Sequence, residues 1–437
     1  MATTASDVAH LLRRAGFGGT ATRVAQLVPL DRPTLVDAVL DIAANPADTL
    51  PPELADPAKG KYEQFVAMLH QWYDRMATSP TPVVEKMTLF LHGHFTTQSS
   101  EVYLPKVIRE QISFYRANAL GNFRTLVDGM ALQPAMLLYL DNASNNKRVP
   151  NQNFARELLE LFTLGVGNYT ETDVIEAARA WTGFTANTDW DAGVSTYAFR
   201  ADWHDTGNKT FLGTTKNFDG PAIIAELFAN PTTAAIMAKF VVSKLWRFFA
   251  SPTVPAGVAD ALAKVLVDGN WELKPVLRAL FLRPEFWTPE TKLGLVRSPA
   301  EWIAAAIRGT GLPAKALNPQ WHHADMGQEL YNPPNVAGWK SNEYWISTSA
   351  AGARANFADN VAYALDKNKL LVDSVSKPPD QAVQAVLDQF QVLSPAPRTL
   401  EVLNAWIAAQ RGAQFQAWAE PGNLVRLVLL APDLQMA

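Results

Sequence analysis

Cysteine is absent from the 437 residues of this chain, and so are long apolar runs and runs of like charge. Without cysteine the protein has no disulfides, thiolate zinc sites, iron–sulfur clusters or cysteine nucleophile. The most apolar stretch, 234–250, is interrupted by Lys239, Lys244 and Arg247, so we expect no membrane span. The 38 basic and 42 acidic side chains are spread along the chain, and we therefore do not expect nucleic acid as a partner.

The composition is that of a packed globule, with 48% hydrophobic and 18% charged residues. Length alone favours two domains, but helical patterning runs through most of the chain, and we expect one large helical domain over 1–437. The first residues, MATTASDVAHLLRRAGFG, contain polar side chains and a basic pair where a signal peptide needs an apolar stretch. This predicts a cytoplasmic protein or one whose leader has been removed.

Apolar residues recur at helical spacing, as in 35–42, which predicts a predominantly helical, all-α fold with irregular loops. Thr170 and Asp173 form a capping-box pattern, which predicts the start of a helix that runs to Trp181. Another helix is expected from about Asn151 to Gly165.

Two segments have a different character. Residues 185–220 are rich in Asp, Asn, Thr and Gly with single aromatic residues between them, which predicts an inserted loop or small β-hairpin. Residues 326–349 contain Pro333, Pro334 and two Trp, so we expect an irregular loop rather than a helix. Long ordered loops in a compact helical protein often carry function.

Five segments together resemble a known bacterial family, the domain of unknown function numbered 1800. They are HLLRRAGFG (10–18), KMTLFLHGHFT (86–96), NQNFARELLELFTLGVGNYTETDVIEAARAWTGF (151–184), HDTGNKTFLG (204–213) and MGQELYNPPNVAGW (326–339). The resemblance names no reaction. It implies a protein that is often exported and often encoded beside a second family resembling sulfatases and alkaline phosphatases, which hints at work on envelope or extracellular polymers.

The sequence departs from the usual family pattern at two places. Residues 91–95 read Leu-His-Gly-His-Phe where many members have Trp-His-Asn-His-Phe. Gln152 stands where a Glu is common, so a role that needs this carboxylate is not expected here.

Two carboxylates are the first candidates for chemistry. Glu157 and Glu160 lie three residues apart on an apolar helix, with Asn153 and Arg156 each one turn earlier. Burying carboxylates is costly unless they are paired, bound to metal or protonated, so this pattern predicts a general acid/base or metal-ligand pair. The structural alternative is that Arg156, or the pair Arg13–Arg14, neutralises them.

His92 and His94 follow an apolar helical run. Residues two apart point about 200° away from each other on a helix, so the two side chains converge only if the helix ends or the segment is extended. Gly93 is compatible with such an ending. The pair could bind zinc, iron or copper; the alternative is a buried histidine bonded to a backbone carbonyl.

The two irregular segments supply further candidates. His204, Asp205 and Lys209 lie within six residues, and these residue types are typical of a loop that is catalytic or contacts phosphate. Gln328 and Trp339 would suit a wall that stacks against carbohydrate, or else a rigid loop whose Trp fills the core.

The leading hypothesis is a hydrolase acting on a glycan or similar polar polymer. Its catalytic residues would be Glu157, Glu160, His204 and Asp205, and its substrate-binding residues His92, His94, Asn153, Arg156, Lys209, Gln328 and Trp339. This hypothesis needs no cofactor.

A first alternative is a divalent metal bound by His92, His94, Glu157, Glu160 and His204. A second alternative is a non-catalytic binding partner of the phosphatase- or sulfatase-like companion, in which the signature residues are buried and serve packing. The chain has no G-x-S-x-G, Walker, dinucleotide-binding or H-E-x-x-H motif, so serine hydrolase, nucleotide-driven and simple metalloprotease functions are not expected.

Overall fold

The computed structural model describes residues 3–292, 294–365, 376–393, 395–412 and 420–437. Helices account for most of the described residues. The strands among these residues form two small hairpins. The prediction of a predominantly all-α fold with a short β insertion is therefore confirmed. None of the described helices is both long and apolar enough to cross a membrane.

The first part of the chain is a series of helices joined by short turns. Proline lies in the first turn of α3, α5, α7 and α9, where its missing N–H is not needed by the helix. The elements are α1 (Ala5–Ala15), α2 (Ala21–Leu27), α3 (Arg32–Val39), η1 (Pro52–Leu54), α4 (Lys61–Thr78), α5 (Pro82–His94), α6 (Ser99–Val102), α7 (Pro105–Ala117), α8 (Phe123–Met130), α9 (Pro134–Tyr139) and η2 (Asn142–Ser144).

The helix expected from about Asn151 to Gly165 begins as α10 (Asn153–Glu157) and continues as a π-helical turn, η3 (Leu158–Thr163). It ends before Gly165, whose φ of +82° a side-chain-bearing residue rarely adopts. The predicted capping box is confirmed, because Thr170 Oγ1 accepts from Asp173 N at the start of α11 (Glu171–Ala180).

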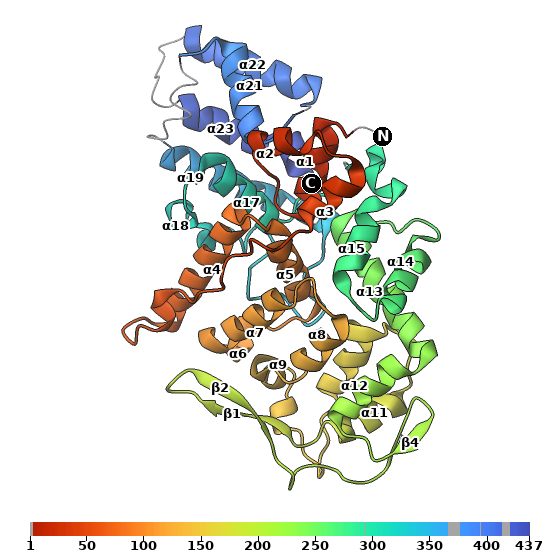
Figure 1. Cartoon of the computed structure of the whole chain (residues 1–437). Coiled ribbons are helices and arrows are strands. Elements are labelled where there is room, and N and C mark those ends of the chain that lie inside the picture. The colour runs from red at the N-terminus through yellow and green to blue at the C-terminus, as the bar shows by residue number, and fades with distance from the viewer. Residues whose placement is uncertain (1–2, 293, 366–375, 394, 413–419) are drawn as a thin grey trace.

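The segment 185–220 contains two antiparallel hairpins. In the first, β1 (Phe184–Asp189) pairs with β2 (Val194–Phe199); in the second, β3 (Lys209–Phe211) pairs with β4 (Thr214–Lys216). The first hairpin lies at one end of the molecule, and helices near the C-terminus lie at the opposite end (Figure 1).

The remaining elements are again helical, and residues 322–341 among them contain no helix or strand. In order they are α12 (Gly220–Ala229), α13 (Pro231–Phe249), α14 (Val258–Asp268), α15 (Leu273–Leu282), η4 (Pro284–Trp287), α16 (Pro289–Lys292), α17 (Pro299–Thr310), α18 (Ala314–Leu317), η5 (Pro319–Trp321), η6 (Asn342–Trp345), α19 (Thr348–Ala364), α21 (Pro379–Gln389), α22 (Pro397–Gly412), α23 (Glu420–Leu430) and α24 (Pro432–Gln435).

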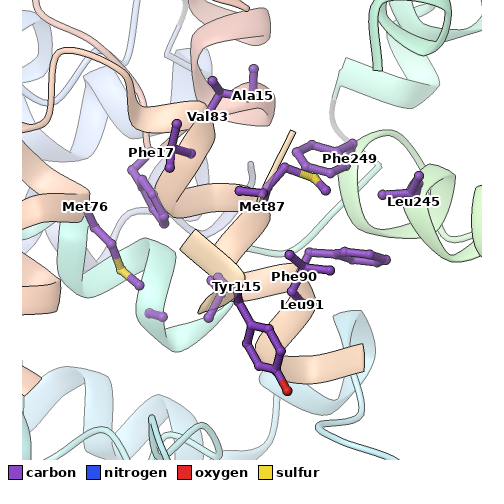
Figure 2. Packing of buried hydrophobic residues seen from close by; sticks show 14 of the residues in the cluster. Ala15, Phe17, Met76, Val83, Met87, Phe90, Leu91, Tyr115, Leu245 and Phe249 are labelled. Atoms are coloured by element: carbon purple, nitrogen blue, oxygen red, sulfur yellow. The ribbon is translucent and has the colours of Figure 1, made fainter. Parts of the chain in front are cut away.

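Helix α5 lies in the middle of the molecule and is buried along nearly its whole length (Figure 1). Its apolar side chains Met87, Phe90 and Leu91 lie among those of neighbouring elements, including Phe17 and Phe249 (Figure 2). A helix buried on all sides has no face that water can reach, so each polar side chain that α5 carries must find a partner inside the protein.

Candidate functional site

The two histidines of α5 point in different directions, because the helix continues through Gly93 and includes His94. The condition under which the two side chains would converge, an end of the helix at Gly93, is therefore not met. On one side, His92 Nε2 accepts from Tyr331 N at 3.0 Å, and its ring contacts Trp339 with 5.1 Å between centroids. Burial lowers the pKa of His92 to about 3, so this imidazole is neutral.

On the other side of α5, His94 lies between a backbone carbonyl and a lysine. Its Nε2 is 3.1 Å from Phe162 O, and its Nδ1 is 3.0 Å from Lys244 Nζ. A carbonyl only accepts, so Nε2 carries the hydrogen and Nδ1 is the acceptor for the lysine. Burial, with the nearby charge of Lys244, places the pKa of His94 well below its ordinary value, which keeps the ring neutral.

Lys244 comes from α13 and reaches the end of the 153–163 helical segment. Its Nζ donates to Leu161 O at 3.1 Å as well as to His94. Carbonyls in the last turn of a helix have no partner within the helix, and here Leu161 and Phe162 offer theirs to Lys244 and His94. Burial and the neighbouring charge of Arg247 lower the pKa of Lys244 to about 8.

A pocket of about 240 Å³ opens beside this lysine. It lies between α5, α13, the start of α17 and the loop that follows residue 326, and its walls combine aromatic rings with a few polar groups. The lining includes His94, Lys244, Arg247, Glu301, Gln328, Trp339, Asn342 and Trp345. Apolar walls with a small number of convergent polar groups are typical of small-molecule sites.

The model of the family described as a protein of unknown function (DUF1800) matches residues 10–436. The chain belongs to the DUF1800 family. No curated protein and no solved structure matches the chain. Two DUF1800 segments recognised in the sequence line the pocket, 86–96 with His94 and 326–339 with one wall. A third, 151–184, supplies the two carbonyls that bond His94 and Lys244.

A glycine lets the DUF1800 loop 326–339 close on α5. Gly338 has a φ of +83°, and a Cβ built there would lie 2.5 Å from the carbonyl oxygen of Gly93. This close approach positions Trp339 over Gly93 and against His92. Gln328 fixes the other end of the loop, because its Oε1 accepts from Ala300 N at 2.9 Å. Both predicted residues of this segment therefore line the pocket.

One pocket wall carries an ion pair between a partly buried glutamate and a buried lysine. Glu301, the third residue of α17, accepts from Lys86 of α5 in an ion pair and from Ser298 N at 2.7 Å. Burial works to raise the pKa of Glu301, and Lys86 and Ser298 outweigh it, so the carboxylate stays ionised. This makes Glu301 a fixed negative charge rather than a proton donor.

The predicted carboxylates Glu157 and Glu160 are neighbours but do not line this pocket. Burial, followed by the charge of Glu160, raises the pKa of Glu157. Glu160 Oε2 accepts from Tyr169 Oη at 2.5 Å. The ion pair of the expected cation is elsewhere, since Arg156 pairs with exposed Glu171 at 2.6 Å. Its charge still lowers the pKa of Glu157, but by less than burial and Glu160 raise it.

The other suggested counter-charges are also elsewhere. The nearest charges to Arg14 include Arg13 and Glu301, so the Arg13–Arg14 pair does not neutralise Glu157. Asn153, predicted to bind substrate, donates to Asp141 Oδ2 at 3.3 Å.

The predicted loop His204–Asp205–Lys209 attaches the hairpin insertion to the helices. His204 Nδ1 is 2.7 Å from Thr182 O, and Asp205 forms an ion pair with Arg179 at 2.8 Å. Lys209 is buried and donates to the Asp205 carbonyl and to an Asn side chain. In these contacts the three residues hold the fold together, as the binding-partner hypothesis expects of the signature residues. None of the three lines the pocket beside Lys244.

The five residues of the metal alternative do not assemble. Within the described part of the chain, no group of three or more His, Asp or Glu side chains is placed to hold a metal ion. His92 and His94 diverge on α5, and His204 is held by Thr182 O on the insertion.

Sequence reasoning did not select Lys244, Arg247 or Glu301. The signal for the first two was present, because they interrupt the most apolar stretch of the chain. A cation in a helix that is otherwise buried either finds an internal partner or faces a cavity. Here Lys244 does both.

Proposed function

We propose that the protein is an enzyme whose reactive group is the side-chain amine of Lys244, acting on a sugar-sized polar substrate that carries a carbonyl group. The observation that carries this proposal is a largely buried amine, with a pKa lowered to about 8, in the wall of an apolar-lined pocket. A lysine desolvated beside another cation is the usual form of an amine nucleophile.

The contacts of Lys244 suit nucleophilic attack. The neutral amine has two hydrogens and one lone pair, and the acceptors His94 Nδ1 and Leu161 O take the two hydrogens. The lone pair is then free to attack a carbonyl carbon. The carbonyl oxygen leaves as water with the two amine hydrogens, and a C=N double bond joins the substrate to Nζ. The step needs no oxidant or reductant.

The rest of the pocket favours a polar, negatively charged substrate. Arg247 also lines the pocket and offers a guanidinium to a carboxylate or phosphate. Trp339 and Trp345 supply flat faces, while Gln328 and Asn342 supply amides for hydroxyl groups.

We expect glyoxylate, a small anionic aldehyde, to be reductively coupled to Lys244 by cyanoborohydride at least tenfold faster than to the exposed Lys264. At pH 8 an amine of pKa about 8 is half deprotonated. The deprotonated fraction of an ordinary lysine at this pH is about a hundredfold smaller. Coupling should therefore fall as pH drops through about 8. Peptide mass spectrometry measures the site and rate.

Two methionine variants separate the specific site from general surface chemistry. Lys244→Met should lose the fast phase while keeping the circular dichroism spectrum, and Lys264→Met should keep the fast phase. Modification spread over surface lysines, with Lys244 unmodified in the folded protein, would refute the proposal.

A second candidate function is general acid/base hydrolysis of a glycan or similar polar polymer at Glu157. It is favoured by the raised pKa of this carboxyl, which stands beside a second carboxylate, Glu160. In this function Glu157 is the proton donor and Glu160, fixed by Tyr169, is the base.

For this candidate, Glu157→Gln should reduce the release of reducing ends from a responsive bacterial polysaccharide by at least about a hundredfold. The matched control is Glu171→Gln, a change at an exposed ion pair that should leave the rate unchanged. Cleavage that survives Glu157→Gln at an unchanged rate would exclude this function.

A further inference from the structure

Buried positive charge exceeds buried negative charge behind the Lys244 pocket. Arg13 and Arg14 of α1, Lys86 of α5 and Arg297 are near enough to one another and to Glu301 for their charges to interact. Glu301 is the one carboxylate among these five groups, and it is engaged by Lys86. Burying several cations with a single anion is unfavourable unless another negative charge completes the group.

The side chain of Arg14 shows directly that acceptors for these buried cations are missing. It is 1% exposed, and Nη2 donates to Thr291 O. Its Nε and Nη1 have no acceptor in the described part of the chain. Burial, together with the charges of Arg13 and Arg297, lowers the pKa of Arg14 to about 9. Buried N–H donors without acceptors cost stability, and an ordered structure normally supplies a partner.

A second pocket, of about 390 Å³, adjoins this group of cations. Arg13, Lys292, Arg297 and Asp433 are among its lining residues. Lys292 is paired with Asp7 at 2.5 Å, whereas neither Arg13 nor Arg297 has a carboxylate within ion-pair distance among the described residues. The oxygens of Asp433 already accept from Ala396 N and Thr399 Oγ1. Arg297 Nε donates to Met436 O at 2.9 Å, which leaves its two terminal nitrogens for a ligand. The pocket therefore presents two guanidinium groups without a paired carboxylate.

A neutral donor in the same pocket also lacks an acceptor. Gln391 is 5% exposed and lines the pocket, and its Oε1 accepts from Gly19 N at 2.7 Å. Its Nε2 has no acceptor within the part of the chain that the structure describes. The hydroxyl-bearing Ser6 lines the pocket as well.

We propose that the pocket lined by Arg13, Arg297 and Gln391 binds an oxyanion of the phosphate or sulfate class, either free or as the charged group of a small organic molecule. Two guanidinium forks and an amide offer more donors than the two oxygens of a carboxylate can accept, and a tetrahedral oxyanion has enough oxygens for them. The volume of the pocket leaves room for an organic portion. This site is separate from Lys244, so it does not depend on the function proposed above.

Titration calorimetry of the whole protein with inorganic phosphate, sulfate and glucose 6-phosphate tests the proposal, against chloride at equal ionic strength. We expect at least one of the three oxyanions to bind and to raise the melting temperature, while chloride does neither. Tighter binding of glucose 6-phosphate than of phosphate would identify an ester as the ligand, and equal affinities would identify the free anion. If none of the three binds better than chloride, the proposal fails.

Arg13→Met should weaken oxyanion binding at least about tenfold, because it removes charge-assisted hydrogen bonds. It should not lower the melting temperature of the anion-free protein, because it also removes repulsion from Arg14 and Arg297. This separates loss of the site from loss of the fold. Arg124→Met, at an exposed ion pair with Asp128, is the control and should bind like wild type. Wild-type affinity in Arg13→Met would contradict the assignment.

Discussion

Replacing Glu301 by glutamine is expected to lower the free energy of unfolding by about 3–5 kcal/mol. Glu301 accepts from buried Lys86 through one oxygen and from Ser298 N through the other. Glutamine has a single acceptor oxygen, so its NH₂ group would face either an ammonium or a backbone N–H. The change also removes the carboxylate whose charge opposes those of Arg14 and Arg297. Denaturant unfolding followed by circular dichroism measures the loss.

Glu63→Gln is a closely matched control. Glu63 also occupies the third position of a helix and also accepts from a lysine, Lys59, and from a backbone N–H, that of Gly60. It differs from Glu301 in being exposed, so its ion pair is screened by water and adds little to stability. Equal destabilisation by the two changes would show that burial of the Lys86–Glu301 pair is not the cause.

The local signals of the sequence were sufficient for the helices. Thr170 and Asp173 act within one turn of α11, and the glycine that ends the 153–163 segment acts at a single residue, so both effects can be read from adjacent positions. The π-helical turn Leu158–Thr163 was not predicted. Its register depends on what lies beyond the helix, including the contacts that its last carbonyls make with Lys244 and His94.

The candidate site was harder to predict because its members are far apart in the sequence. His94, Gln328 and Trp339 were selected from motifs and do line one pocket, but the lysine that contacts His94 comes from α13, 150 positions after His94. Tertiary packing brings these residues together, and no spacing rule connects them.

Closeness in sequence does not bring side chains of the insertion together. His204 and Asp205 are adjacent, yet one binds Thr182 O and the other binds Arg179. Neighbouring side chains diverge, and a composition rich in His, Asp and Lys served equally well to attach a hairpin to α11. Composition alone therefore could not distinguish a catalytic loop from a structural anchor.

The largest structural effect outside the pocket is expected at Glu85, also on α5. Its side chain is fully buried and accepts from Arg75 Nε at 2.8 Å and from Arg116 Nε at 3.0 Å. Arg116 is shared with Asp48, which also binds Arg109. Burial alone would raise the pKa of Asp48, but these two guanidinium groups lower it to about 2, so the network is held together by ionised carboxylates at neutral pH.

Glu85→Gln should therefore lower the free energy of unfolding by about 3–5 kcal/mol, because the amide NH₂ would face the guanidinium donors of Arg75 or Arg116 in the interior. Glu171→Gln, at an exposed ion pair that water screens, should leave stability nearly unchanged. Unfolding in urea at neutral pH compares the two variants with wild type. A Glu85→Gln protein as stable as Glu171→Gln would mean that the arginines find other acceptors. The polar groups on α5 would then be adjustable rather than fixed, and the placement of His94 against Lys244 on the same helix would lose its rigid support.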